Sequence, residues 1–390
     1  AFLSAGFGAL VGVIVITLLS GWVQRFALKF SSPEFFAVYF LAFASFVGLG
    51  GAPMLKTVVS IGIGFSLAAI GMDSVSGSLR LTFGVDQLIA GVSFLVAVIG
   101  LFGLGELILT VEEGLHLKGI DAKVRARDVL RTVAEMPRHW ATLLRSALVG
   151  VWMGITPGGP TAASFMSYGL AKRFSKYRGN FGKGEPDGII APETADHSAG
   201  TSAMLPMLAL GIPGSATAAV MLGGLMIWGL NPGPMLFVER PDFVWGLIAS
   251  MYLGNVLAVV LVLATVPLFA SILRIPFAII GPAIVVICFI GAYTVGSRPF
   301  DLWLALAFGA VGFLFKRLDY PIAPLILAMV IGDKAEDAFR QSLIMSKGSL
   351  TIFWANPLVA SLMALGLLLL AWPLVAGAAR ALSTTMRKPA

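Results

Sequence analysis

Long apolar stretches, separated by short charged links, fill most of the chain. Six of them approach or exceed the roughly 20 apolar residues that a membrane-spanning helix needs. They cover residues 3–23, 34–52, 86–110, 242–273, 276–296 and 355–378, and a shorter one covers 54–71. With 58% hydrophobic and 12% charged residues, the composition is far from that of a soluble domain. The pattern predicts an all-α polytopic membrane protein with about 10 transmembrane segments.

We expect a single integral membrane domain over residues 1–390, which the charge pattern divides into four parts. An N-terminal four-helix part (1–111) precedes a charged loop (112–145), and a region with two interrupted apolar stretches (146–240) precedes the C-terminal helices (241–390). The loop carries seven basic and five acidic residues, and basic loops of membrane proteins favour the cytoplasmic side. The net charge of +7 is therefore interpreted as this bias and not as nucleic-acid binding.

A re-entrant hairpin is predicted in the first part of the interrupted region. The polar stretch 172–196 again carries five basic residues, so it is expected on the same side as the charged loop. Between the two lie uncharged arms, 146–156 and 161–171, each about 16 Å long as a helix, which is half of a ~30 Å hydrocarbon core. Pro157-Gly158-Gly159-Pro160 separates the arms with residues that break helices. We expect this tip near the middle of the membrane.

A second break is predicted at Gly211-Ile212-Pro213-Gly214. It divides the apolar stretch 199–230, which would measure about 48 Å as one helix, far more than a membrane requires. Two half-helices are therefore expected on either side of the break. The few charges that follow, Glu239, Arg240 and Asp242, leave open whether this segment crosses the membrane or re-enters it.

The two breaks together predict a transport site. Irregular backbone at membrane depth has to be buried in protein or line a wet cavity, and half-helices offer N-termini to anions and unwound carbonyls to Na⁺. The alternative is that Gly and Pro merely kink packed helices. The candidate substrate-binding residues are Pro157, Gly158, Gly159, Thr161 and Ser164 at the first break, and Gly211, Pro213, Gly214, Ser215 and Thr217 at the second. Na⁺ is expected at the backbone carbonyls of Ile155, Thr156, Leu210 and Gly211.

A polar run at 191–202 precedes the second broken segment. Cation coordination or gating by Glu193, Asp196, Ser198 and Thr201 is one interpretation of this run. The other is an ordinary helix start, with Asp196 or Ser198 as the N-cap. His197 is expected in a loop.

Sequence signatures of enzymes and metal centres are absent. Phe181-Gly182-Lys183-Gly184 is similar to part of a P-loop, but Gly184 stands where Ser or Thr should follow the lysine. There is no HExxH motif, the three histidines are scattered, and the single cysteine, Cys288, excludes a disulfide framework. We therefore expect neither an enzyme nor a cofactor, apart from Na⁺ as the coupling ion.

Two other functions stay open beside a transporter. One is an intramembrane enzyme that acts on a phosphorylated lipid, because hairpin tips can present helix N-termini to phosphate. Such an enzyme would need basic or acid/base residues at the tip, and residues 155–164 contain none. The other is a passive anion channel, which no feature of the sequence separates from a single-chain site.

Motifs along the whole chain give it a family resemblance. They are Gly71-Met72-Asp73 with Thr82-Phe83-Gly84, the Gly154–Pro160 tip, Ala163–Tyr168, Phe181–Gly184, Ala191-Pro192-Glu193, Leu210–Thr217, Gly229–Pro234, and Ala335–Ser342 with Met345-Ser346. With these motifs the chain resembles the large membrane subunit, TctA, of the tripartite tricarboxylate transporter family.

The resemblance implies a secondary transporter of the inverted-repeat type in the bacterial inner membrane. It implies uptake of di- and tricarboxylates such as citrate by symport, driven by an ion gradient, usually of Na⁺. A periplasmic binding protein (TctC-like) would deliver the substrate, and a small membrane subunit (TctB-like) would accompany this chain.

Two features set the chain apart from the family pattern. Family members start about a hundred residues earlier, with a hairpin and a broken helix that pair with the two breaks here, so we expect an N-terminal part of the repeat to be missing before Ala1. After Ala191-Pro192-Glu193 the family pattern has two asparagines, where this chain has Asp196 and His197. An aspartate adds charge and a histidine adds a titratable group, which leaves the coupling ion open.

Overall fold

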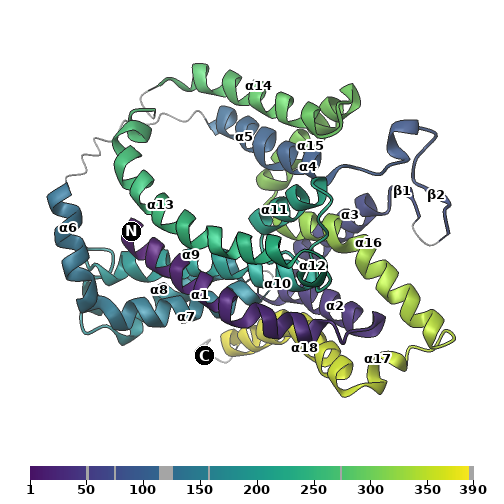
Figure 1. The fold of residues 1–390 in the computed structure, drawn as a ribbon, viewed down its shortest axis with the longest axis horizontal. Helices are drawn as coiled ribbons and strands as arrows, with labels where there is room; N and C mark the ends of the chain where they lie inside the picture. Colours follow the sequence, from purple (N-terminus) through teal and green to yellow (C-terminus); the bar gives the residue numbers. More distant parts are fainter. Residues whose placement is uncertain (50–51, 74–75, 114–125, 157–158, 273–274, 386–390) are drawn as a thin grey trace.

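The computed structural model describes residues 1–390 except 50–51, 74–75, 114–125, 157–158, 273–274 and 386–390. Its described residues form α-helices joined by short links, with one small antiparallel hairpin of β1 (Gly71–Met72) and β2 (Leu79–Arg80) (Figure 1). Apart from that hairpin, the all-α prediction is confirmed for these residues.

The helices of the N-terminal part are α1 (Phe2–Ala27), α2 (Ser32–Leu49), α3 (Met54–Ala68), α4 (Phe94–Val98) and α5 (Gly105–Glu113), the last two joined by a π-helical turn at Ile99–Leu104. The middle of the chain forms α6 (Ala126–Glu135), α7 (Trp140–Ile155), α8 (Pro160–Phe174), α9 (Asp187–Ser202), α10 (Met204–Leu210), α11 (Ala216–Ile227) and α12 (Leu236–Glu239). The C-terminal part forms α13 (Pro241–Ile272), α14 (Phe277–Gly296), α15 (Pro299–Arg317), α16 (Ile322–Met345), α17 (Ile352–Ala355) and α18 (Pro357–Thr385).

Seven helices of the described chain are long and apolar enough to cross a membrane: α1, α2, the continuous α4–α5 helix, α13, α14, α15 and α18. They include all six of the long predicted segments, so the chain is a multi-pass membrane protein. The predicted total of about ten segments stays a prediction. One boundary was wrong, because residues 86–93 form a 3₁₀ turn and a left-handed bend at Gly91 (φ +79°), and the helix begins only at Phe94.

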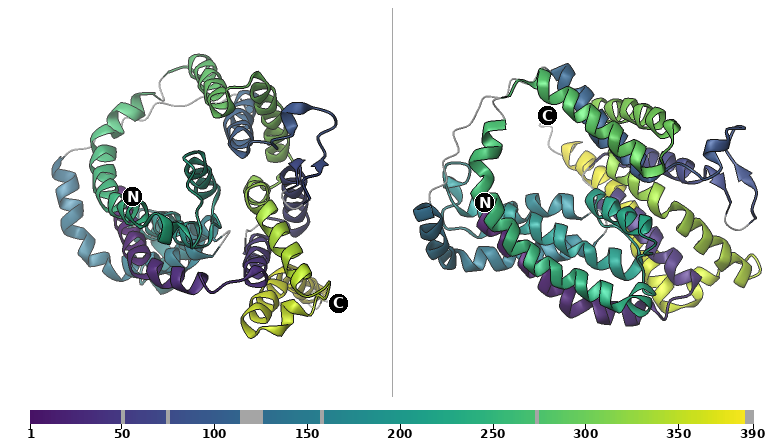
Figure 2. Two further views of the ribbon diagram at one scale, coloured as in Figure 1. Left: turned by 45° about the vertical axis from the view of Figure 1, so that its right-hand side comes forward. Right: turned by 45° about the horizontal axis from the view of Figure 1, so that its top comes forward.

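The helices gather into two groups. In the first, α9 lies among α1, α7 and α8, with α13 along α1; in the second, α16 packs on α2 and α3, and α18 packs on α2. Figure 2 shows α13 and α14 as an arc on one side of the molecule, with α11 inside it. The apolar side chains of α13 and α14 are mostly exposed, as expected of helices that face lipid.

Glycine pairs let α9 pack closely against two neighbours. A Cβ built on Gly8 of α1 would lie 2.1 Å from the Thr194 carbonyl oxygen, and one on Gly150 of α7 would lie 2.4 Å from the Ala195 carbonyl oxygen. One turn further on, Gly154 lies as closely against the Ala199 carbonyl oxygen, and Gly12 lies against the Thr201 side chain. Small residues at this spacing are the usual means of close helix contact in membranes. Both GxxxG patterns therefore serve packing, and they bury a helix that is rich in polar residues.

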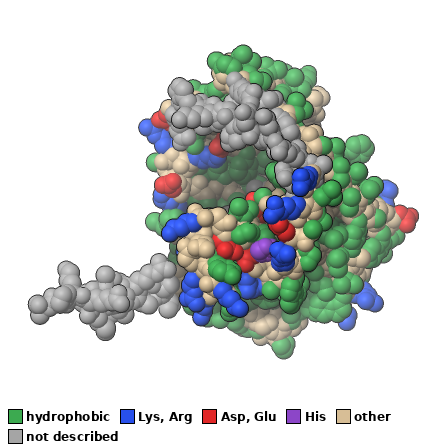
Figure 3. All heavy atoms as spheres, turned by 90° about the vertical axis from the view of Figure 1, so that its left-hand side faces the viewer, with side chains coloured by type: hydrophobic (Ala, Val, Ile, Leu, Met, Phe, Trp, Pro, Cys, Tyr) green, Lys and Arg blue, Asp and Glu red, His purple; other side chains and the backbone are tan. Residues whose placement is uncertain are grey.

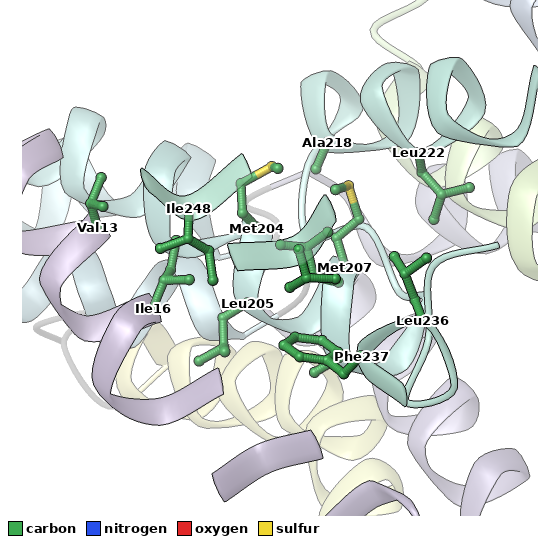
Figure 4. Packing of buried hydrophobic residues seen from close by; sticks show 13 residues of the cluster. Val13, Ile16, Met204, Leu205, Met207, Ala218, Leu222, Leu236, Phe237 and Ile248 are labelled. Carbon is green, nitrogen blue, oxygen red and sulfur yellow. The ribbon is translucent and has the colours of Figure 1, made fainter. Parts of the chain in front are cut away.

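The largest apolar cluster surrounds α10, immediately after α9. Met204, Leu205 and Met207 lie among side chains of α1, α11, α12 and α13 (Figure 4). Because α10 is only seven residues long, this packing and not its own hydrogen bonding holds it in place. The second predicted break follows directly after this well-packed turn.

Basic side chains gather at one end of the molecule. The residues between α8 and α9 expose several of them. Figure 3 shows Lys and Arg interspersed with acidic side chains on one face of the molecule. The start of α7 lies at this same end, because the Arg145 guanidinium lies 5.2 Å from the ring centroid of Phe174 at the end of α8. The two basic stretches therefore share one end; its assignment to the cytoplasm stays a prediction.

Candidate functional site

The first break joins two helices that run back along each other. α7 ends at Ile155 and α8 begins at Pro160, with Gly159 before it. Pro157 and Gly158 lie outside the described residues, and so does the side chain of Thr161. The helices have 16 and 15 residues, about 24 and 22 Å, less than a ~30 Å membrane core. Both helices are longer than the predicted arms of about 16 Å, because α7 begins at Trp140 and α8 continues to Phe174. The re-entrant hairpin stays a prediction.

The second break lies where it was predicted. α10 ends at Leu210, and Gly211 caps it in the left-handed conformation (φ +72°). α11 begins at Ala216, and the Ser215 hydroxyl accepts a hydrogen bond from the Ala218 amide at 3.1 Å, which makes Ser215 the N-cap. The apolar stretch is therefore divided at the predicted break into α10 and α11, and the end of α9 occupies its first residues. One of the predicted hydroxyl residues caps α11.

The two breaks lie against each other. A Cβ built on Gly214 would lie 3.1 Å from the carbonyl oxygen of Gly154, in the last turn of α7, and 3.3 Å from the Ala203 Cβ. Residues 60 positions apart in sequence thus pack through their backbones. The pairing of the breaks was expected from their chemistry alone, and the contact gives it a geometric basis.

A cavity of about 720 Å³ opens beside this contact. Its walls come from α8, α9, α10, α11 and α13, and its size suits a small organic ligand. Of the predicted site residues, the cavity is lined by Ser164, Asp196, Thr201, Ser215 and Thr217. Residues from both breaks and from the polar run therefore share one space.

The polar wall of the cavity is held by short-range contacts on α8 and α9. The Ser164 hydroxyl lies 3.3 Å from both the Pro192 carbonyl oxygen and the Asp196 Oδ1. His197 Nδ1 lies 3.1 Å from the Glu193 carbonyl oxygen and 3.9 Å from the Asp196 Oδ2. A carboxylate, an imidazole and several hydroxyls thus stand on one side.

The polar run differs from its prediction in two respects. α9 begins at Asp187 and passes through Pro192, so Asp196 and Ser198 lie inside the helix and neither is an N-cap. His197 is likewise helical and lines the cavity, contrary to the expected loop position. The prolines and glycines of this segment resemble a loop in sequence, but close packing on α1 and α7 holds it as a helix.

Two candidate ion residues do not line the cavity. Ser198 is fully buried, and its hydroxyl donates to the Ala147 carbonyl oxygen at 2.9 Å, so it joins α9 to α7. Glu193 lies one helical turn from His197, outside the cavity lining. Asp196 and Thr201 are therefore the better-placed members of the predicted ion group.

The apolar wall was not predicted. It includes Phe165, Met204 and Met221 together with Leu247 and Met251 of α13. No sequence signal identifies these residues, because apolar side chains on a membrane helix look the same whether they face lipid or a cavity.

The predicted Na⁺ carbonyls lie at the ends of α7 and α10. The Thr156 carbonyl already accepts a hydrogen bond from the Gly159 amide at 2.9 Å. Over the described ranges no three His, Cys, Asp or Glu side chains are grouped as they would be around a metal ion. Na⁺ binding there would thus depend on backbone and hydroxyl oxygens.

The sequence of this chain is similar to those of known proteins. Residues 1–327 match the tripartite tricarboxylate transporter TctA family. An uncharacterized 52.8 kDa protein in the TAR-I ttuC' 3' region of Agrobacterium vitis is 34% identical over 368 residues, which cover 94% of this chain and 73% of that protein. An uncharacterized protein in the TAR-II ttuC' 3' region of the same organism is 38% identical over 219 residues, 56% of this chain and 90% of its own length. No solved structure matches.

The match extends over most of the chain and includes both breaks and the cavity between them. The resemblance drawn from the motifs is therefore confirmed. The chain belongs to the TctA family of tripartite tricarboxylate transporters, and it is a component of a transporter and not an enzyme.

Proposed function

We propose that this chain is the large membrane subunit of an ion-gradient-driven uptake transporter, and that it binds a di- or tricarboxylate in the cavity between the two breaks. The observation that carries the proposal is the composition of that cavity, in which Ser215 and Thr217 at the start of α11 face the hydroxyl and carboxylate groups of α8 and α9.

The start of α11 suits a carboxylate. This helix has 12 residues, and its first amides leave partial positive charge at the end that opens on the cavity. Ser215 and Thr217 add hydroxyl donors at the same place. A substrate carboxylate bound there would replace water with directed hydrogen bonds.

The cavity wall opposite the start of α11 gives a physical reason for a bound cation. Asp196 lines the same cavity, and its carboxylate would repel an anionic substrate in a poorly hydrated site. A Na⁺ ion held by Asp196, Thr201 and substrate oxygens would turn this repulsion into attraction. We therefore assign the coupling ion to the α9 side of the cavity, where substrate and cation bind together.

The family supplies the partners of the proposed system. Its transporters are tripartite, so a TctC-like periplasmic binding protein and a TctB-like small membrane subunit complete the proposed assembly in a bacterial inner membrane. The binding protein would deliver the substrate from outside, and the cavity in this subunit would receive it.

Uptake of labelled citrate or a labelled dicarboxylate into vesicles that contain the complete set of subunits tests the proposal. Uptake should require an inward Na⁺ gradient and should stop when the gradient is dissipated. Flux of the same size without any gradient would contradict coupled transport.

A further inference from the structure

A lysine with no role in the site described so far lies beside the second break. Lys334 follows Ile331 by three residues on α16, and Ile331 packs against Ile212 of the break. A Cβ built on Gly211 would lie 3.5 Å from the Lys334 Nζ. Because a C–C bond measures about 1.5 Å, the ammonium is within about 5 Å of the Gly211 Cα.

This ammonium is partly buried, and within the described part of the chain no residue pairs with it or accepts its hydrogen bonds. Its acidic neighbours on α16 face another way. Asp333, Glu336 and Asp337 line a separate cavity of about 300 Å³, in which Glu336 pairs with Arg80 at 2.8 Å. Withdrawing a lysine from water without an acidic partner costs free energy. Another group of negative or partly negative charge should therefore stabilise the Lys334 ammonium.

The end of α10 supplies that charge. The last carbonyls of a helix carry partial negative charge and favour a cation. The Gly211 amide donates to the Met207 carbonyl and the Gly233 amide donates to the Leu208 carbonyl, at 3.0 Å each. No described amide donates to the carbonyls of Ala209 or Leu210. The Pro232 carbonyl oxygen lies at the same corner, 2.6 Å from the Cβ built on Gly211.

We infer that the Lys334 ammonium is a tethered cation at the C-terminal end of α10, where it takes the place of a Na⁺ ion at the second break. The inference rests on the proposed function and deepens it, because it confines the exchangeable ion to the α9 side of the cavity. Lys334 is a positioning residue: neither it nor Gly211 lines the cavity. It neutralises the carbonyls that end α10 and so holds the break in shape for the start of α11.

Thermal unfolding of the purified chain, without substrate, tests this. Lys334→Met should unfold at a lower temperature than the wild type in choline chloride. NaCl at the same concentration should restore much of the loss, because Na⁺ can occupy the vacated position among the carbonyls. Lys334→Arg keeps the charge and should follow the wild type. Lys347→Met, an exposed lysine just beyond the same helix, is the matched control and should respond to the two salts as the wild type does.

If Lys334→Met is destabilised equally in the two salts, Lys334 contributes only packing and the inference is overturned. The inference is also overturned if the variant is as stable as the wild type. If the methionine variant does not fold in either salt, Lys334→Gln replaces it under the same criteria. Uptake adds a second readout, since the Na⁺ dependence of the variant should be steeper than that of the wild type. The unfolding comparison needs no substrate, so a wild type that fails to transport would refute the proposed function and leave this result standing.

Discussion

Arg340 of α16 holds Asp73 through both carboxylate oxygens, with Nη1 at 3.2 Å from Oδ1 and 2.9 Å from Oδ2. Asp73 follows β1 and is almost fully buried, and Arg80 of β2 approaches it to 3.4 Å. Arg80 also pairs with Glu336, which raises the pKa of its guanidinium further. The loop between α3 and α4 is thereby fixed to the polar half of α16.

Arg340→Met should destabilise the protein, because it removes the two hydrogen bonds that the Arg340 guanidinium donates to the buried Asp73 carboxylate. We expect a loss of roughly 2 kcal/mol, below that of a fully buried pair because Arg340 is partly exposed. Thermal unfolding in detergent measures it. Arg131→Met, which removes an exposed i,i+4 pair with Glu135 at 2.9 Å, should change stability by less than about 0.5 kcal/mol. If the two substitutions lower the free energy of unfolding equally, the buried Asp73 contact contributes no more to stability than an exposed ion pair.

Gly214→Leu should abolish uptake while the protein still inserts into the membrane. Its side chain would collide with the Gly154 carbonyl oxygen, 3.1 Å from the first added carbon, and would separate the two breaks. Gly224→Leu is the control on α11, since a Cβ there meets nothing within 4 Å. Uptake by vesicles with matched amounts of inserted protein decides the outcome, and full activity of Gly214→Leu would dismiss the contact between the breaks as incidental.

Two substitutions of Ser215 separate its capping role from its role in the cavity. Ser215→Ala removes the acceptor for the Ala218 amide and should cost about 1 kcal/mol of stability. Ser215→Asp keeps an N-cap acceptor but adds negative charge to the anion site. The aspartate variant should therefore be as stable as the wild type and yet lose substrate binding, measured by titration with labelled citrate or a dicarboxylate. If the aspartate variant keeps its affinity for the substrate, the substrate does not bind at the start of α11.

Asp196→Asn should raise the Na⁺ concentration for half-maximal uptake by about tenfold, equivalent to a loss of about 1.4 kcal/mol in ion binding. The physical reason is that an amide oxygen attracts Na⁺ less than a carboxylate does. Glu239→Gln, at an exposed acid far along the chain from α9, is the control and should leave this concentration unchanged. An unaltered Na⁺ dependence in Asp196→Asn would exclude Asp196 as an ion ligand.

Hydrophobic patterning was sufficient to predict six of the seven membrane-length helices of the described chain and the position of both breaks, because lipid-facing helices need uninterrupted apolar residues and Gly or Pro interrupts them visibly. It did not mark α15 as a separate segment. It failed for α9, whose polar residues and Pro192 do not look like a helix, since its helical state depends on the glycines of α1 and α7. Ser164, Ser215 and Thr217 of the cavity could be predicted from their place after each break. Leu247, Met251 and Lys334 could not, because their positions follow from how distant helices pack.

The glycine contacts of α9 also determine which parts of the molecule can move. Where a glycine lies directly against the backbone of α9, as at Gly8, Gly150 and Gly154, neither helix can slide without a collision. We therefore expect α1, α7 and α9 to move together. A change of shape during a transport cycle is then expected outside this group, where the chain enters and leaves it.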